Sequence, residues 1–191
     1  MAKQVVTTKE RTVRTYTEMW HTSDCLLSLG QENPEGSYHQ FMGSLVFTAF
    51  TLEAYLNHAG EKLFQCWSDL ERLGPKEKLN VIAEHIGLEV NYGGRPWQVI
   101  KDLFGFRNDI AHGKTVEINK TEKVPLHKHT EEEGPLFTPT RWEKYCCEQN
   151  AVRAREDVEK IVHLIHEASG IQDEHPFDHG MQVWTSSLVE V

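Results

Sequence analysis

The longest helical pattern in the chain runs from Tyr38 to about Leu73. Its apolar residues recur at helical spacing, and its first half also carries apolar residues on the other faces of the helix. A helix of this kind has to be covered by other elements on more than one side. We therefore expect a central helix that the rest of the chain surrounds. Its periodic positions are Phe41, Leu45, Thr48, Leu52, Tyr55, Leu56, Leu63, Phe64 and Trp67.

Two segments in the first half of the chain predict helices that cover the central one. From about Val5 to Leu29 the apolar residues again have a roughly helical period, and residues 30–36, which contain Gly, Pro and Asn, should form the turn that ends this helix. Pro75 is well placed at the first position of another helix, which Gly87 should end. Short turns of this kind predict antiparallel neighbours.

Two more helices are expected in the second half of the chain. Pro96 should restart a helix that ends at Gly113, in the left-handed conformation that glycine favours at a helix end. The last helix covers residues 140–169, and its first residues, Thr140 to Glu143, match a capping box. Residues 114–139 between them are irregular, and the alternation of Val116 and Ile118 with polar neighbours weakly favours a short hairpin there.

These patterns together predict one all-α domain. We expect an antiparallel bundle of four to five helices over residues 1–170, with an irregular loop at 114–139. Residues 171–191 form a C-terminal tail that contains Phe177, Trp184 and Leu188, and we expect it to dock on another surface, for which a second copy of the chain is one candidate. The four cysteines have neither a disulfide framework nor paired metal-binding spacings, so we expect reduced thiols that pack in the core.

The charge balance restricts the partners that the chain can bind. There are 20 Lys and Arg residues against 29 Asp and Glu residues, which gives a formal net charge of -9. Such a chain has no overall attraction for nucleic acid, so any binding of this kind needs a local basic cleft. Because the sequence contains neither a secretory signal nor an apolar run that could span a bilayer, we expect a cytoplasmic protein with no membrane partner.

The residues best suited to catalysis or ligand binding lie between Lys101 and Lys114, in the sequence KDLFGFRNDIAHGK. Asn108 and His112 are four positions apart, so they project within about 40° of each other on a helix. The long Arg107 side chain lies on the adjacent flank and can reach the same space near the helix end. Histidine, with an ordinary pKa near 6.5, exchanges protons at cellular pH, and arginine binds phosphate oxygens with a bidentate fork. The pair suits phosphodiester chemistry on RNA, which supplies its own nucleophile in the 2′-hydroxyl.

Other interpretations of these residue types remain open. Arg107 could be an ordinary surface residue, and His112 could simply favour the negative end of the helix dipole. His127 and His129 could bind a metal together with His112, His175 or His179, but no motif fixes two imidazoles on one helical face. Nucleophilic catalysis by Cys146 or its neighbour is weakly indicated, because no histidine is near them in sequence.

The string FRNDIAH, from Phe106 to His112 near the end of a late helix, resembles the R-N-x-x-x-H signature of HEPN domains. By helix order the resemblance extends over about residues 37–169, and its specific part is this string. It implies a helical bundle, usually dimeric, in which the Arg and His of both protomers face a shared cleft. Many HEPN proteins are metal-independent endoribonucleases of toxin–antitoxin and phage-defence systems. Residues 51–58, TLEAYLNH, also resemble the second helix of many HEPN proteins, where Glu53 would match a supporting acidic residue.

The resemblance implies a role for each of these residues. Arg107 would bind and stabilise the phosphate, His112 would act as general acid or base, and Asn108 would orient the pair or contact the substrate. Glu53 would hold Arg107 or His112 in place, or alternatively be a carboxylate at the edge of the core with a structural partner. Lys101 and Lys114 are the nearest lysines that could bind the RNA backbone.

The partners follow from the same resemblance. No cofactor is implied, and a twofold dimer would double the local positive field at its axis. An antitoxin or another defence protein is a further expected partner. In toxins paired with a minimal nucleotidyltransferase the histidine is commonly followed two residues later by a Tyr, whereas Lys114 occupies that position here, so this particular partnership is not indicated. The alternative function is a non-catalytic HEPN-like helical module that dimerises or binds a protein or nucleotide, which the aromatic tail favours.

Overall fold

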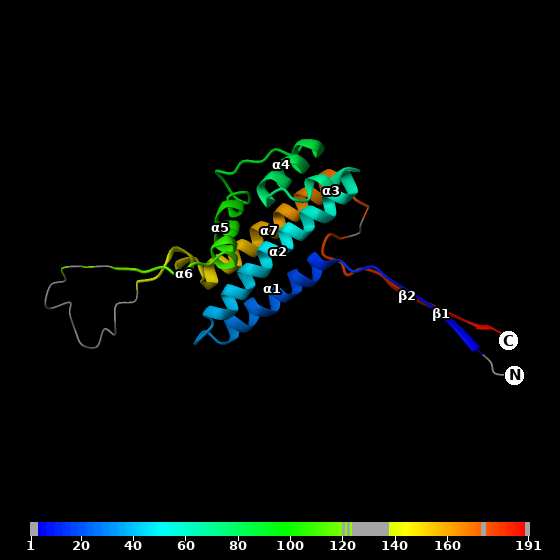
Figure 1. Cartoon of the computed structure of the whole chain (residues 1–191), viewed down its shortest axis with the longest axis horizontal. Helices are drawn as coiled ribbons and strands as arrows, with labels where there is room; N and C mark the ends of the chain where they lie inside the picture. Colours follow the sequence, from blue (N-terminus) through cyan, green and yellow to red (C-terminus); the bar gives the residue numbers. More distant parts are fainter. Residues whose placement is uncertain (1–3, 120, 122, 124–137, 173–174, 190–191) are drawn as a thin grey trace.

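The computed structural model describes residues 4–119, 121, 123, 138–172 and 175–189. The described part is mostly helical with one small two-stranded sheet, and Figure 1 shows its arrangement. The helices are α1 (Thr15–Glu32), α2 (Tyr38–Leu63), α3 (Trp67–Leu70), α4 (Pro75–Ile86), α5 (Val99–Ala111), α6 (Arg141–Tyr145) and α7 (Glu148–Ser169). The strands are β1 (Gln4–Arg11) and β2 (Gln182–Val189).

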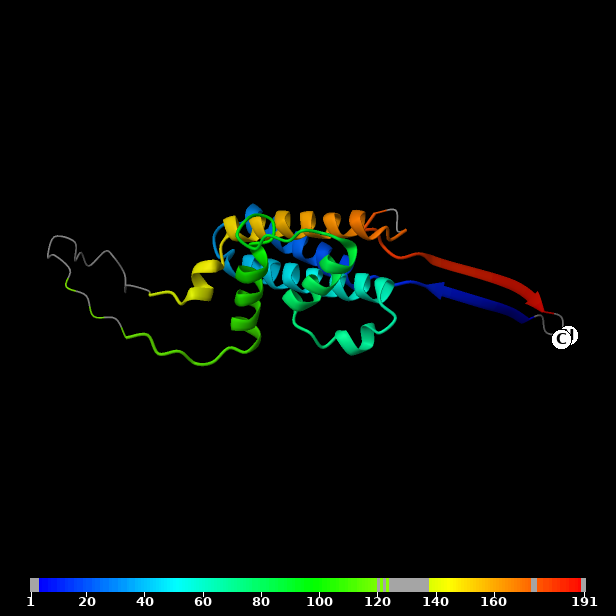
Figure 2. The ribbon, with the colours of Figure 1, turned by 90° about the horizontal axis from the view of Figure 1, so that it is seen from above.

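Helix α2 is the centre of the bundle, as its apolar pattern predicts. Helices α1 and α7 lie along it, α4 packs on α2 and α7, and α5 lies across the long axes of α2 and α7 (Figure 2). The crossing of α5 departs from the simple antiparallel bundle expected from the sequence. The side chains with no solvent exposure come mainly from these elements: Leu45, Leu52, Tyr55, Leu56, Leu79, Ile82, Leu103, Val158, Ile161, Val162 and Ile165.

Small and hydroxylated residues let α1 approach α2 closely. A Cβ added at Gly30 would lie 2.7 Å from the Phe41 ring, so the two helices leave no room for a larger residue there. The buried Ser23 hydroxyl lies 2.7 Å from the Thr48 hydroxyl and donates to the Ser44 carbonyl at 3.0 Å. These hydrogen bonds satisfy the polar groups of an otherwise apolar contact.

The predicted central helix is shorter than its apolar pattern, because the chain leaves the helix after Leu63 and α3 folds back on it. The Trp67 side chain is buried against Gly60, where an added Cβ would lie 2.2 Å from Cε2 of the indole ring. The apolar residues beyond Leu63 therefore do belong to the core. They reach it from a separate short helix rather than from a continuation of α2.

The prediction that the first helix starts near Val5 is wrong for residues 4–11, which form β1. β1 pairs with β2 in antiparallel register, with Val5 opposite Leu188 and Lys9 opposite Trp184. Runs of Val and Thr in β1 favour an extended strand. The all-α prediction therefore holds for the bundle but not for the two ends of the chain.

The tail docks on α1 before it reaches β2. The Phe177 ring stacks on Trp20 with ring centroids 4.6 Å apart, and the Thr12 amide donates to the Met181 carbonyl at 2.9 Å. A Cβ at Gly180 would lie 1.9 Å from the Thr12 carbonyl oxygen, so a glycine is needed where the two ends of the chain meet.

Helix boundaries are confirmed at several predicted signals. Pro75 begins α4, and Gly87, with φ 69°, ends it in the left-handed conformation. Thr140 and Glu143 form the predicted capping box, in which the Thr140 amide donates to a Glu143 carboxylate oxygen at 2.6 Å. The helix they begin is α6, which ends at Tyr145, and α7 starts separately at Glu148, so the single last helix predicted from the sequence is two helices.

Other boundary predictions are wrong. Helix α5 begins at Val99 rather than Pro96, because the residues after the cis Arg95–Pro96 bond form a turn. Gly113 is not among the described glycines with positive φ, and His112 is the C-cap residue. Val116 and Ile118 are exposed and belong to no strand of the described part of the chain, so the weak hairpin prediction is not realised there.

The cysteines are free thiols, as predicted, but they do not share one environment. Cys146 is buried and donates to the Tyr38 carbonyl at 3.3 Å. Burial, together with the neighbouring Cys147, raises the pKa of the Cys146 thiol to about 11. Cys25 and Cys66 are exposed and Cys147 is half-buried, so the prediction that the cysteines pack in the core is correct for Cys146 and wrong for Cys25 and Cys66.

Replacing Gly60 with alanine should destabilise the fold. Alanine favours a helix over glycine by about 1 kcal/mol, whereas overpacking in a core costs about 1–3 kcal/mol, and the clash with Trp67 is severe. We expect Gly60→Ala to lower the free energy of unfolding by at least about 1 kcal/mol in a denaturant titration followed by circular dichroism. Gly94→Ala is the control, because no atom lies within 4 Å of a Cβ added there. Equal stability of the two variants would contradict the packing of Trp67 on α2.

Candidate functional site

Arg107 projects from α5 toward α2 and is held there on several sides. Its Nη2 atom donates to and forms an ion pair with a Glu53 carboxylate oxygen, and its Nη1 atom donates to Asn108 Oδ1 at 2.9 Å. Its guanidinium carbon lies 5.9 Å from the Phe50 ring centroid and 5.8 Å from the Phe104 ring centroid. The Arg107 side chain is 17% exposed and that of Glu53 is 27% exposed. The guanidinium group therefore has a fixed position near the surface.

His112 occupies the end of the same helix. As the C-cap residue it is exposed, and its amide donates to the Asn108 carbonyl at 2.9 Å. It lines an open groove of about 600 Å³ together with Asn108 and Lys114 of the same segment and residues 140–142 of the α6 region. The imidazole can therefore reach a ligand that lies in this groove.

Arg107 and His112 do not meet within one chain. Five positions on a helix correspond to a rotation of roughly 140°, so the two side chains leave α5 on different sides. No hydrogen bond joins them among the described residues, and Arg107 does not line the groove of His112. A single copy therefore does not show the expected arrangement, in which Arg107 reaches the space that His112 faces. Asn108 connects the two regions, because it lines the groove and accepts the hydrogen bond from Arg107.

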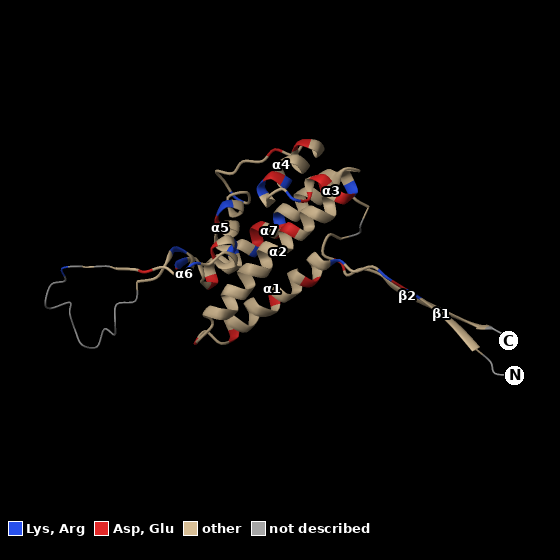
Figure 3. Ribbon diagram, in the orientation of Figure 1, with Lys and Arg blue, Asp and Glu red and all other residues tan. Residues whose placement is uncertain are grey.

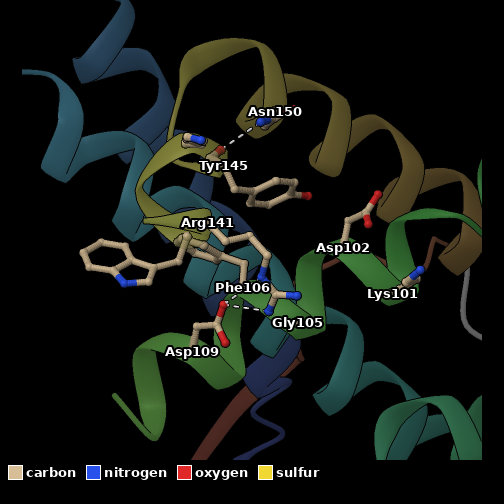
Figure 4. A pocket seen from close by; sticks show the side chains of 10 residues that line it. Lys101, Asp102, Gly105, Phe106, Asp109, Arg141, Tyr145 and Asn150 are labelled. Atoms are coloured by element: carbon tan, nitrogen blue, oxygen red, sulfur yellow. Dashed lines mark hydrogen bonds and ion pairs between the residues drawn. The ribbon is translucent and has the colours of Figure 1, made fainter. Parts of the chain in front are cut away.

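A smaller cavity of about 260 Å³ adjoins the groove and shares Asp109, Arg141 and Trp142 with it. Figure 4 shows Arg141 over this cavity, with its guanidinium group directed at Asp109. The Arg141 Nη2 atom donates to Asp109 Oδ2 at 2.7 Å, and this bond raises the pKa of Arg141 above its ordinary value. At the inner end of the cavity, burial raises the pKa of the Tyr145 phenol, so this group stays protonated.

The two predicted lysines lie at different parts of this surface. Lys101 lines the smaller cavity and Lys114 lines the groove, and both are exposed. Lys144 adds a further positive charge from α6. Figure 3 shows basic residues on α6 and the adjacent part of α5, whereas α1 carries only acidic ones. The surface beside α5 therefore carries more basic than acidic side chains, with Asp102 and Asp109 within it and Asp109 paired with Arg141.

Helix α6 contributes the residues that sequence reasoning missed. Arg141, Trp142 and Lys144 lie more than 25 positions after His112, so nothing in their spacing indicates contact with α5. The capping box at Thr140 was the available signal, because it fixes the start of the helix that carries them. Asp109 is 33% exposed and pairs with Arg141. His127 and His129, the candidate metal ligands of the irregular segment, lie outside the described residues.

The described part of the chain has neither a metal-binding cluster nor a helix that could span a membrane. No group of three or more His, Cys, Asp or Glu side chains in it is arranged to hold a metal ion. None of its helices combines the length and apolar character of a membrane span.

Comparison of the chain with protein-family models, with curated proteins and with solved structures finds no match. A functional assignment therefore has to come from the residues and geometry of this surface.

Glu53 and Asp109 each pair with one arginine, but we expect their removal to have different effects. Glu53→Gln leaves the mostly buried Arg107 without a counter-charge, which should lower the free energy of unfolding by about 1–2 kcal/mol, less than for a fully buried pair. Asp109→Asn should cost below about 1 kcal/mol, because the side chain of Arg141 is 79% exposed. Chemical denaturation of both variants measures the difference. A Glu53→Gln protein as stable as Asp109→Asn would show that the Glu53–Arg107 pair contributes little.

Proposed function

We propose that the chain is a metal-independent endoribonuclease of the HEPN type, acting through Arg107, Asn108 and His112. The observation that carries the proposal is the fixed arginine fork. Glu53 and Asn108 hold the Arg107 guanidinium, and Asn108 also borders the groove into which His112 opens. A guanidinium has five N–H donors, and these two partners use one donor each. The Nε–H of Arg107 is buried and has no partner among the described residues, so the donors left for phosphate oxygens are the second N–H of Nη1 and of Nη2.

The proposed reaction uses the 2′-hydroxyl of RNA as the nucleophile. A bond forms between the 2′-oxygen and phosphorus while the bond from phosphorus to the 5′-oxygen breaks, which leaves a 2′,3′-cyclic phosphate and a 5′-hydroxyl. His112 takes the proton from the 2′-hydroxyl or gives one to the departing 5′-oxygen. Arg107 stabilises the negative charge that develops on the phosphoryl oxygens, and Asn108 keeps the fork oriented toward the substrate.

The different directions of Arg107 and His112 support a dimeric site. Because the two side chains leave α5 on sides roughly 140° apart, one copy cannot easily bring both to one phosphate. Two copies that meet at the C-terminal end of α5 could combine Arg107 of one with His112 of the other. The exposed lysines and Arg141 beside α5 would then lie near a twofold axis, where their fields add.

The resemblance to HEPN nucleases also suggests the biological setting of this activity. We place the enzyme in the cytoplasm, in a toxin or antiviral defence context, where a further defence-system or antitoxin protein restrains it. RNA is its substrate and the site requires no cofactor.

A non-catalytic module is the second candidate, and one observation favours it. Arg107 is largely buried, contacts two aromatic rings and already has Glu53 as a partner. An arginine in this environment can have a purely structural role, in which it joins α5 to α2. In that case the same helical surface would bind a protein or a nucleotide without cleaving it.

The two candidates differ in what the purified chain does to single-stranded RNA in the presence of a chelator. The nuclease proposal expects cleavage with cyclic phosphate ends, and a loss of at least about 100-fold in rate for His112→Ala and for Arg107→Ala. Cleavage is followed on a labelled oligoribonucleotide, and circular dichroism checks the helical content of each variant.

Arg72→Ala and His85→Ala are the matched controls, since both residues are exposed and lie on or before α4, outside the candidate site. They should cleave at the wild-type rate. Cleavage that persists in the Arg107→Ala, His112→Ala double variant would rule out the proposed site.

A further inference from the structure

β1 and β2 form a ribbon that none of the described helices covers. β1 and β2 extend from the bundle at the end opposite to α6, as Figures 1 and 2 both show. Every residue of β1 is exposed. A two-stranded ribbon is marginally stable alone in water, and stability normally requires a third strand or a packed face. We therefore expect the ribbon to gain a further strand or a covering surface from another molecule.

The register places Val5, Trp184 and Leu188 on one face of the ribbon, and Val6 and Val183 on the other. Residues directly opposite each other share a face, so Val5 with Leu188 and Lys9 with Trp184 lie on the same side. Trp184 is 68% exposed and Leu188 is 70% exposed. Exposed apolar residues of this size on one strand usually mark a contact surface.

The two edges of the ribbon are not equivalent. β1 carries Lys9, Glu10 and Arg11, and charges of this kind protect an edge strand from pairing with another chain. β2 has the sequence QVWTSSLV, without a charged residue, a proline or a glycine. In the part of the chain that the structure describes, β2 has β1 as its one neighbouring strand. The edge that is open for pairing is therefore that of β2.

We propose that β2 pairs with β2 of a second copy of this chain, antiparallel and about a twofold axis at Ser186. The product is a four-stranded sheet with the order β1, β2, β2, β1. The bundles of the two copies lie at its two ends, and the charged β1 strands form its outer edges.

The sequence of β2 is self-complementary in this register. A twofold axis perpendicular to the sheet pairs residues of the same face, so an antiparallel pair of identical strands has to be centred on a residue. Centring on Ser186 puts Trp184 opposite Leu188 of the second copy, and Thr185 opposite Ser187. Centring on Thr185 instead puts Trp184 opposite Ser186, which leaves the indole ring without an apolar partner. Pairs of an aromatic and an aliphatic residue, and of two hydroxyl residues, are favourable across antiparallel strands.

The same register makes a continuous apolar stripe. On one face, Val5 and Leu188 of one copy line up with Trp184 of the other, and the twofold axis repeats this row. The paired sheet then has four strands and a row of apolar side chains in contact on one face, which meets the requirement that the isolated two-stranded ribbon lacks. The close contact of Gly180 with Thr12 holds the base of the ribbon, so the two strands reach the partner already paired.

This interface differs from the one expected at the nuclease site. β2 and the C-terminal end of α5 lie at opposite ends of the bundle (Figure 1), so pairing of β2 does not bring Arg107 and His112 of two copies together. Its test is the change in mass that substitutions at Ser186 cause, whereas the test of the nuclease site is the cleavage of RNA and its loss in the Arg107 and His112 variants. A chain that keeps its mass in Ser186→Lys contradicts the pairing of β2 alone, and a chain that does not cleave RNA contradicts the nuclease proposal alone.

A charge introduced at the twofold axis tests the pairing in the full-length chain. Ser186→Lys puts two lysines directly opposite each other, and Ser186→Glu does the same with two carboxylates, so each variant should repel its own copy. By light scattering and sedimentation equilibrium we expect each variant to have a lower mass than the wild-type particle, and half of it where the pairing of β2 is the one interface between copies. An equimolar mixture of the two should regain the wild-type mass, because lysine then faces glutamate.

Thr7→Lys is the matched control, because Thr7 lies directly opposite Ser186 on β1 and on the same face. It should keep the wild-type mass, since β1 is an outer strand of the proposed sheet. A wild-type chain with the mass of a single copy, a Ser186→Lys chain with the wild-type mass, a mixture that does not recover it, or an equal loss in Thr7→Lys would each overturn the proposal. If the wild-type chain is a single copy and Trp184→Ser weakens its binding to single-stranded RNA, the ribbon is an RNA-binding arm instead.

Discussion

The fold depends on burying α2 on almost every side. Between Tyr38 and Gly60 its one Asp, Glu, Lys or Arg residue is Glu53, so the helix cannot face water over most of its length. Helices α1, α4, α5 and α7 pack around it and remove this apolar surface from solvent. The exception, Glu53, lies where α5 crosses, and the carboxylate meets Arg107 there. The position of the candidate site thus follows from the burial of α2, because the one charge on this part of the helix needs a partner where α5 covers it.

The sequence predicts those parts of the fold that local rules control. Helices with apolar periodicity, the proline at the start of α4, the left-handed Gly87 and the capping box at Thr140 are all confirmed. The parts that it does not predict depend on contacts between distant residues. β1 is a strand because residues 182–189 pair with it, and no local pattern reveals a partner at the other end of the chain. Similarly, the burial of Trp67 against Gly60 depends on a turn after α2 that the apolar pattern passes through without interruption.

The candidate site shows the same division. Helical spacing relates Asn108 to His112, and a resemblance led to Glu53, which pairs with Arg107 in the structure. Spacing could not show that Arg107 turns toward α2 while His112 opens into a groove, because that depends on how α5 crosses the bundle. Nor could it reveal Arg141, which the fold brings to Asp109. Arg141 and the exposed Lys101, Lys114 and Lys144 lie beside α5 at one end of the bundle. The ribbon of β1 and β2 lies at the opposite end, so the proposed RNA site and the proposed pairing edge of β2 are separate parts of the chain.

In the proposed reaction, Arg107 and His112 promote attack by the 2′-hydroxyl of RNA on the adjacent phosphate. The most direct test compares an oligoribonucleotide with the same strand carrying one 2′-deoxynucleotide at the position of cleavage, and determines the product ends by mass spectrometry. The mechanism predicts 2′,3′-cyclic phosphate and 5′-hydroxyl ends from the first strand and no cut at that position in the second. Cleavage of the deoxy-substituted position, or products with 5′-phosphate ends, would contradict it, because either result requires a nucleophile other than the neighbouring 2′-hydroxyl.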